Sequence, residues 1–236
     1  MKAAHVPIAM APVSAAVLVA SGYGVRFGVW DYRLGFQLIS WSFYTGLATA
    51  AVALAALLIP RLRAGHVVGL AAALVIGLGV AYVPWQWQRD GRAAPPINDI
   101  TTDIDNPPAF VAAVPLRAGS PVSTTYPGAD TAAKQSGAFP DIRPVDLALP
   151  PPAAFARALD VAKRFGWTIA AVDPAAGRIE ATATTPWFGF RDDVVIRVTP
   201  TATGSRIDIR SLSRVGRGDR GTNAKRVRAF LAEFAA

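Results

Sequence analysis

The sequence predicts an α+β protein: an N-terminal three-helix transmembrane segment, followed by a small two-layer domain of antiparallel sheet with two helices. Two observations lead to this prediction. The first third of the chain is almost entirely apolar and holds only five of the 24 lysines and arginines. From residue 144 onward, short segments alternate apolar and polar residues, and two stretches show helical periodicity. A proline-rich stretch joins the two parts.

Residues 1–88 are predicted to be a membrane anchor. Three apolar segments, at about residues 6–25, 38–59 and 67–84, are long enough to span a bilayer, and none contains an ionisable side chain. A transport pathway would need such groups within the spans, so we expect the helices to pack through small residues instead. Trp85 and Trp87 close the third segment like an interfacial aromatic belt. A cleaved signal peptide is the alternative for the first segment.

The basic residues that flank the spans do not decide the orientation by number. With the amino terminus inside, the inner flanks hold three and the outer flanks four. The compact turn that contains Arg61 and Arg63, and no acid, favours the amino terminus inside. The chain is then expected in the cytoplasmic membrane, with its soluble domain on the outer, periplasmic side.

Residues 89–143 are predicted to be an extended, proline-rich connector that packs on the domain. Twelve of the 19 prolines lie between residues 93 and 152, which excludes a long helix or a central strand. A short helix is expected at about residues 130–136. Asp99, Asp103 and Asp105 form an oxygen-rich cluster that would suit calcium or magnesium, but the spacing does not match a calcium-binding loop. We expect Asx turns rather than a metal site there.

Residues 144–236 are predicted to be the soluble α+β domain. Helices are expected at residues 151–165 and 223–234, and strands at residues 145–149, 167–172, 178–185, 192–199 and 206–213. The helices should cover one face of an antiparallel sheet. The other face would carry Glu180, Arg197, Asp208 and Arg210. These side chains form either cross-strand ion pairs or a ligand platform.

Composition excludes several classes of function. The chain has no cysteine, which removes disulfides, thiolate nucleophiles and cysteine-ligated metals. Its two histidines, His5 and His66, lie beside apolar segments, so the soluble part has none for a catalytic triad or a typical zinc site. Eight basic and two acidic residues lie between residues 206 and 228. No aromatic platform accompanies this basic patch, so nucleic acid is not expected as a partner.

The segment RSLSRVGRGDRGTN, residues 210–223, is the strongest candidate site. It joins the last strand to the closing helix, and its glycines spell GxGxxG. A dinucleotide fold is not expected, because a second parallel strand and a distal acid do not follow. Glycines permit positive φ, Thr222 or Asn223 could cap the helix, and a helix amino terminus with arginines attracts anions. The candidate anion- or partner-binding residues are Arg210, Arg214, Gly216, Arg217, Gly218, Arg220, Gly221 and Asn223.

The same arginines have an alternative role within the protein. Asp192, Asp193 or Asp219 could occupy them and pin the loop to the sheet. The ligand would then be internal, and the segment would be a scaffold.

Four separated motifs resemble the bacterial domain-of-unknown-function family DUF1499. They read PPINDITTDIDNPPAF, YPGADTAAKQSGAFPDIRP, GWTIAAVDPAAGRIEATATTPWFGFRDDVVIRV and DIRSLSRVGRGDRGTN. The resemblance extends from about Pro95 to the carboxyl end, and the three-span leader is also similar to that of many bacterial members. It implies a bacterial membrane protein and brings no activity, substrate or cofactor.

These features favour a membrane-anchored envelope protein that acts as a binding or accessory module rather than an enzyme. The expected partners are the lipid bilayer, through three helices, and an anionic lipid, another anionic ligand or a protein, with no cofactor. One rival is a hydrolase that uses magnesium, calcium or manganese held by Asp99, Asp103, Asp192, Asp193 or Asp219. Another is a purely structural subunit of a membrane complex.

Overall fold

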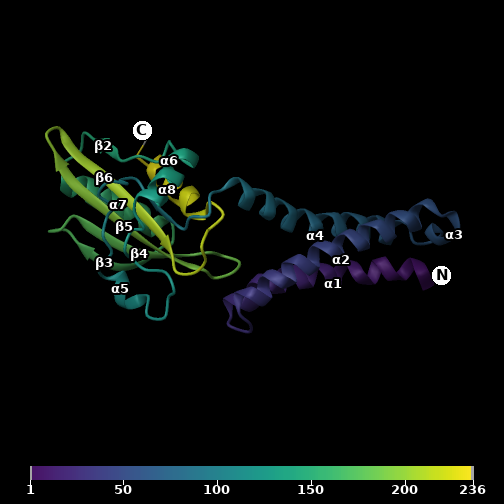
Figure 1. The fold of residues 1–236 in the computed structure, drawn as a ribbon. Coiled ribbons are helices and arrows are strands. Elements are labelled where there is room, and N and C mark those ends of the chain that lie inside the picture. The colour runs from purple at the N-terminus through teal and green to yellow at the C-terminus, as the bar shows by residue number, and fades with distance from the viewer. Residues whose placement is uncertain (1, 235–236) are drawn as a thin grey trace. The chain divides into compact units, whose positions relative to one another are not determined.

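The computed structural model describes residues 2–234. The chain forms two compact units: Met1–Asp90 with Pro186–Gly189, and Gly91–Thr185 with Phe190–Ala236. The first unit is helical and the second contains the sheet, so the predicted α+β class is confirmed (Figure 1).

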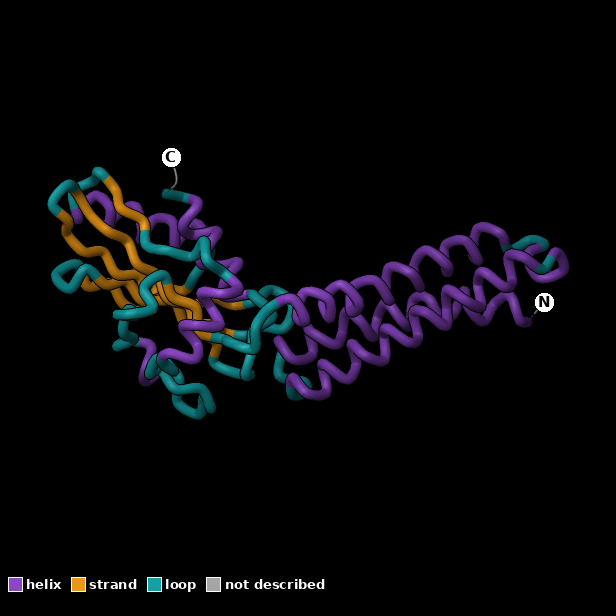
Figure 2. Tube along the Cα trace, turned by 45° about the horizontal axis from the view of Figure 1, so that its top comes forward, coloured by secondary structure: helices purple, strands orange, loops and turns teal. Residues whose placement is uncertain are grey.

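The first unit contains three long helices, α1 (Lys2–Arg26), α2 (Tyr32–Leu58) and α4 (Val67–Ala93), which run side by side in Figure 2. All three are long and apolar enough to cross a membrane, as predicted. Helix α2 begins six residues before the predicted span, because the Asp31 carboxylate caps it by accepting hydrogen bonds from the backbone N–H groups of Arg33 and Leu34. The one-turn helix α3 (Pro60–Arg63) forms the expected basic turn.

Small residues let the helices approach closely, as predicted for spans without ionisable groups. A Cβ atom on Gly77 of α4 would lie 2.7 Å from the carbonyl oxygen of Gly46 of α2, and the reverse distance is 2.8 Å. Ala11, Ala53 and Ala73 form a buried cluster among the three helices. Since lipid gives no hydrophobic drive between helices, this close contact is what holds them together.

Replacing Gly77 with alanine is therefore expected to destabilise the helical unit by about 1–3 kcal/mol, because its methyl group would meet backbone that cannot move aside. Gly79, two residues along the same helix, is the matched control, since a Cβ there has nothing within 4 Å. Thermal unfolding of the full chain in detergent should show a lower midpoint for Gly77→Ala and an unchanged or raised midpoint for Gly79→Ala. Equal midpoints for the two variants would contradict the close packing.

The segment Pro186–Gly189, which lies between strands β4 (Arg178–Thr184) and β5 (Arg191–Thr201), also belongs to the first unit. The Trp187 indole N–H donates to the backbone oxygen of Val19 at 3.1 Å. The Phe188 ring packs against Phe36 and Trp87, with ring centroids 5.5 and 5.7 Å apart. These two aromatic residues thus complete the packing of the helices at that end.

The second unit is an antiparallel sheet with helices. Its strands are β1 (Asp99–Thr101), β2 (Val145–Leu147), β3 (Thr168–Asp173), β4 (Arg178–Thr184), β5 (Arg191–Thr201) and β6 (Gly204–Ser213). Its helices are α5 (Ala113–Leu116), α6 (Ala129–Ala138), α7 (Pro151–Arg164) and α8 (Thr222–Ala232). The order across the sheet is β1-β6-β5-β4-β3. Strand β2 also pairs with β6, at residues 205–207, whereas β1 pairs with residues 210–212 of that strand. Each helix and strand expected from periodicity is present, with ends shifted by a few residues at most.

The main core lies between one face of the sheet and helices α7 and α8 (Figure 1). Alternate residues of the central strands, such as Ile179, Ile196 and Ile209, are fully buried there. They meet Val161 of α7 and Phe230 of α8, which are also fully buried. This is the two-layer arrangement that the alternation of apolar and polar residues predicts.

The opposite face of the sheet is also covered, by segments of the predicted connector, for which the sequence did not indicate a face. Helix α5 and the segments beside it lie over this face, and Phe110, Ala113, Val195 and Leu212 form a small apolar cluster there. The charged side chains of this face are therefore buried: Glu180 and Asp208 are at most 1% exposed. Buried charges need partners of opposite sign, and the site is built from such pairs.

Strand β1 lies within the proline-rich segment and was not expected. It pairs with β6 at the edge of the sheet, in a stretch free of proline, so its backbone N–H groups are available. Asp99 is in this strand, and the expectation of a turn at Asp99 is wrong. Asp103 does form the expected Asx turn, because its Oδ1 accepts hydrogen bonds from the backbone N–H groups of Asp105 and Asn106.

Candidate functional site

Arg210, at the start of the candidate segment, is an internal residue. It lies on β6, is 2% exposed, and donates two parallel hydrogen bonds to the Asp99 carboxylate at 2.9 and 2.7 Å. Its guanidinium lies over the rings of Phe110 and Tyr126, 5.0 and 5.4 Å from their centroids. Burial raises the pKa of Asp99, and the hydrogen bonds from Arg210 only partly offset this. Arg210 therefore neutralises a buried carboxylate and has no capacity left for a ligand.

Arg214 is also engaged within the domain. Its guanidinium bonds both oxygens of Asp193, at 2.7 and 3.0 Å. Arg117, from the segment that covers this face, reaches the same carboxylate at 2.6 Å. Burial alone would raise the pKa of Asp193, but hydrogen bonds from Arg214, Arg117 and Thr182 outweigh it and lower the pKa. One carboxylate thus holds two arginines over the sheet.

Asp219 organises the entrance of helix α8. Its two carboxylate oxygens accept hydrogen bonds from the backbone N–H groups of Gly221 and Asn223, and burial raises its pKa. The expectation that Thr222 or Asn223 caps the helix is wrong. Asn223 is fully buried, and its side-chain amide donates to the backbone oxygen of Asn98 at 2.9 Å. The cap lies further back because the chain turns through positive φ at Arg220 and Gly221 before the helix begins.

The other candidate partner, Asp192, lies on the opposite face of β5 from Asp193 and meets Arg226 of α8 at 2.6 Å. Two of the three expected internal acids thus hold arginines, and the third holds backbone. Together with the pair between Arg210 and Asp99, these contacts engage Arg210, Arg214 and Arg226 of the basic patch within the domain.

Arg217 differs from its neighbours. It is exposed and makes no hydrogen bond or ion pair with any residue of the described range 2–234. It lies between Gly216 and Gly218, and a Cβ atom on Gly218 would lie 3.2 Å from the Cα of Pro96. Gly216 has a φ of +88°, which a glycine adopts without strain. Arg220 is also exposed, and partial burial of its guanidinium lowers its pKa.

The loop Gly216–Gly221 packs against the first residues of its own unit. The Gly216 oxygen accepts from the Asn98 side chain, and the Asp219 N–H donates to the Ile97 oxygen at 3.2 Å. The Arg220 side chain lies against Gly91. Gly91 follows Trp87, which closes the third apolar span, by four residues. The loop therefore packs on the stretch that leads from the end of α4 into the sheet.

The three aspartates of the oxygen-rich cluster, Asp99, Asp103 and Asp105, do not converge on one point. Asp99 pairs with Arg210, whereas Asp103 pairs with Arg197 and Arg206, both at 2.9 Å. Asp105 is exposed and contacts Asp103 through its backbone N–H, not its carboxylate. Within residues 2–234, no group of three or more histidines, aspartates or glutamates is arranged to hold a metal ion.

The remaining charges on this face form cross-strand pairs, as one of the two sequence interpretations expected. Arg197 and Asp208 are directly opposite each other on β5 and β6, and their side chains meet at 3.0 Å. Glu180 has a role that sequence reasoning missed. Its carboxylate accepts the backbone N–H groups of residues 111–113 at 2.8–3.1 Å, which fixes the start of α5. An acid alternating among apolar residues of a strand is the signal that could have indicated it.

Comparison with known proteins agrees with the motifs of the soluble domain. The family model DUF1499, described as a protein of unknown function, matches residues 99–234. No curated protein and no solved structure matches the chain. The matched region is more than half of the 236 residues and includes the sheet, the covering segments and the helix α8. The chain therefore belongs to the DUF1499 family.

Proposed function

We propose that the protein is a membrane-anchored, non-enzymatic binding module whose soluble domain engages anionic lipid headgroups at the membrane surface. The three apolar helices form the anchor, and the exposed arginines Arg92 and Arg217 of the second unit form the binding surface. We place the domain on the outer side of the cytoplasmic membrane, as an accessory module of the cell envelope.

The observation that carries this proposal is the position of Arg217. The loop that bears it packs against residues 91–98, which are the last residues of α4 and those that follow it. Arg92, in this same stretch, is also exposed and has no hydrogen bond or ion pair among the described residues. Arg92 and Arg217 thus belong to the same unit, in which the loop that bears Arg217 packs on the stretch that contains Arg92.

Guanidinium groups suit phosphate. Each can donate two parallel hydrogen bonds to phosphate oxygens. Basic residues near an anionic membrane surface contribute about 1 kcal/mol each. The internal ion pairs leave Arg210 and Arg214 out of this surface, so it is smaller than the sequence suggested.

The test compares lipids retained by the full chain. After purification from bilayers that contain phosphatidylglycerol and phosphatidylcholine, native mass spectrometry should show a preference for phosphatidylglycerol. The double variant Arg92→Gln/Arg217→Gln should lose about 30-fold in this preference, as two contacts of about 1 kcal/mol each imply.

Lys163→Gln is the control for loss of a positive charge elsewhere on the domain, because Lys163 is exposed on α7 without an ion pair in the described structure. It should keep the wild-type preference. A double variant that retains phosphatidylglycerol as well as the control does would refute the headgroup surface. Arg214 is not suitable for this test, because its removal disturbs Asp193.

A further inference from the structure

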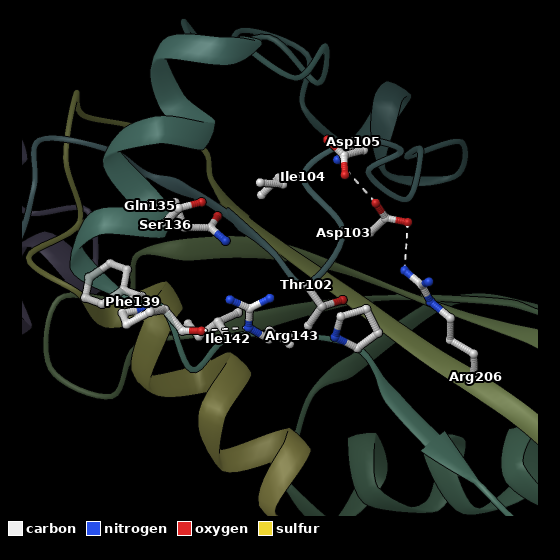
Figure 3. A pocket seen from close by; sticks show the side chains of 12 residues that line it. Thr102, Asp103, Ile104, Asp105, Gln135, Ser136, Phe139, Ile142, Arg143 and Arg206 are labelled. Carbon is white, nitrogen blue, oxygen red and sulfur yellow. Dashed lines mark hydrogen bonds and ion pairs between the residues drawn. The ribbon is translucent and has the colours of Figure 1, made fainter.

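The soluble domain has a separate pocket that shares no residue with the loop Gly216–Gly221. Its volume is about 320 Å³, at the lower end of the range for small-molecule sites. The segment after β1, the end of α6, residues 140–144 and Arg206 of β6 form its walls (Figure 3).

Hydrogen bonds and a cation–π contact with neighbouring elements hold the walls of this pocket in place. The Gln135 amide pairs with both the N–H and the oxygen of Thr101, at 3.0 and 2.6 Å, which fixes α6 to β1. Phe139 has the Arg228 guanidinium 5.1 Å from its ring centroid, and Arg228 is in turn held by both oxygens of Asp141. Rigid walls limit the ordering cost of binding, which favours a ligand.

Most of the charge in the pocket is already neutralised. Arg206 donates to Asp103 and Asp208, and Asp103 also pairs with Arg197. These groups form one wall and are fully engaged with each other. The other two charged residues of the lining are Arg143 and Asp105.

Arg143 and Asp105 have unused capacity. The Arg143 Nε donates to the Pro140 oxygen at 3.0 Å, and its two terminal nitrogens have no partner in the described residues. No side chain of residues 2–234 pairs with the Asp105 carboxylate. In Figure 3 Arg143 lies in the lower middle of the view and Asp105 at the upper right, with Ile104 above Arg143 and Phe139 on the far side of Arg143 from Asp105.

We propose that this pocket binds a small zwitterion with an apolar body, of the amino-acid or dipeptide class. The ligand's carboxylate pairs with the terminal nitrogens of Arg143, and its ammonium group with the Asp105 carboxylate. Its apolar side chains lie against Phe139 and Ile142. A simple anion would leave Asp105 unpaired and a simple cation would leave Arg143 unpaired, so a ligand with both charges fits the lining best.

The probe for this proposal is leucyl-leucine, titrated into the full chain in detergent by calorimetry. We expect saturable binding. N-acetyl-leucyl-leucine, which lacks the ammonium group, and leucyl-leucinamide, which lacks the carboxylate, should each bind about tenfold more weakly, as the loss of one charge-assisted contact implies. This comparison uses the unaltered protein, so it does not depend on whether a variant folds.

Variants then assign the two contacts. Arg143→Gln should bind leucyl-leucine and its amide equally, because the carboxylate contact is gone. Asp105→Asn should bind leucyl-leucine and its acetylated form equally. Arg191→Gln, which removes an exposed arginine outside the lining, should behave like the wild type.

Two results would overturn the proposal: no saturable binding of leucyl-leucine at millimolar concentration, or blocked forms that bind as well as the zwitterion. Neither result bears on the lipid headgroup surface, which has different residues and a different measurement. The two proposals can therefore fail separately.

Discussion

Replacing Asp193 with asparagine is expected to destabilise the sheet domain by about 3–5 kcal/mol, the cost of removing one partner from a buried ion pair. Asp193 is fully buried and receives hydrogen bonds from Arg117, Arg214 and Thr182. Asparagine offers one acceptor oxygen in place of two and no charge. Arg117, whose side chain is only 3% exposed, would then be a buried cation without a counter-charge.

Native-state hydrogen exchange of β5 and β6 amides, in the full chain in detergent, measures this loss as a free energy of opening. Asp160→Asn is the control, because Asp160 makes an exposed pair with Arg164 within α7. Such pairs contribute about 0.3–0.5 kcal/mol. If the two variants lost similar amounts, Asp193 would not hold the covering segment to the sheet.

The loss should also depend on pH. The pKa of Asp193 is lowered in the folded protein, so its contribution is fully present above its unfolded pKa of about 4. That contribution disappears as the pH falls through the lower, folded value. The wild type and Asp193→Asn should therefore approach each other in stability only in strong acid.

Much of the sheet domain could be predicted because its sequence follows simple periods. The alternation in β4, β5 and β6 and the spacing of apolar residues in α7 and α8 are local signals, and each led to the correct element. Strand β1 could not be found in this way. It has three residues, and what keeps it in place is its pairing with β6, more than 100 residues later in the chain.

The positions and ion-pair partners of the arginines were only partly predictable from the sequence. Arg210 is two residues after Asp208 on β6, so alternation places it on the charged face of the sheet with Arg197, and Arg214, directly after the end of the strand, continues this alternation. That signal was present in the sequence. The identity of each partner was not, because it depends on how the connector folds over the face and brings Arg117 to Asp193. Arg217 lies in the loop after the strand, so alternation along β6 does not predict which way its side chain points.

Replacing Arg210 with methionine is expected to cost about 3–5 kcal/mol as well, for the opposite reason. Methionine fills part of the space between Phe110 and Tyr126, but the Asp99 carboxylate, 1% exposed, loses the guanidinium that neutralises it. The exposed Lys134, which pairs with Asp130 along α6, provides the control substitution Lys134→Met. Hydrogen exchange of β1 and β6 amides should show a large loss for Arg210→Met and little change for the control.

Two further measurements separate an unpaired charge from lost packing. Adding Asp99→Asn to Arg210→Met should restore stability to within about 1–2 kcal/mol of the wild type, since no buried charge remains.

The pH dependence of stability is the second measurement. Burial already raises the pKa of Asp99, and loss of Arg210 raises it further. When the pKa of an acid is higher in the folded state than in the unfolded state, the protein loses stability as the pH rises from the unfolded pKa, about 4, to the folded one. The cost of Arg210→Met should therefore be large at neutral pH and smaller in mild acid, whereas the double variant should lack this dependence. A cost that stayed constant with pH would mean that Arg210 acts through packing, and that the carboxylate of Asp99 is not the group it serves.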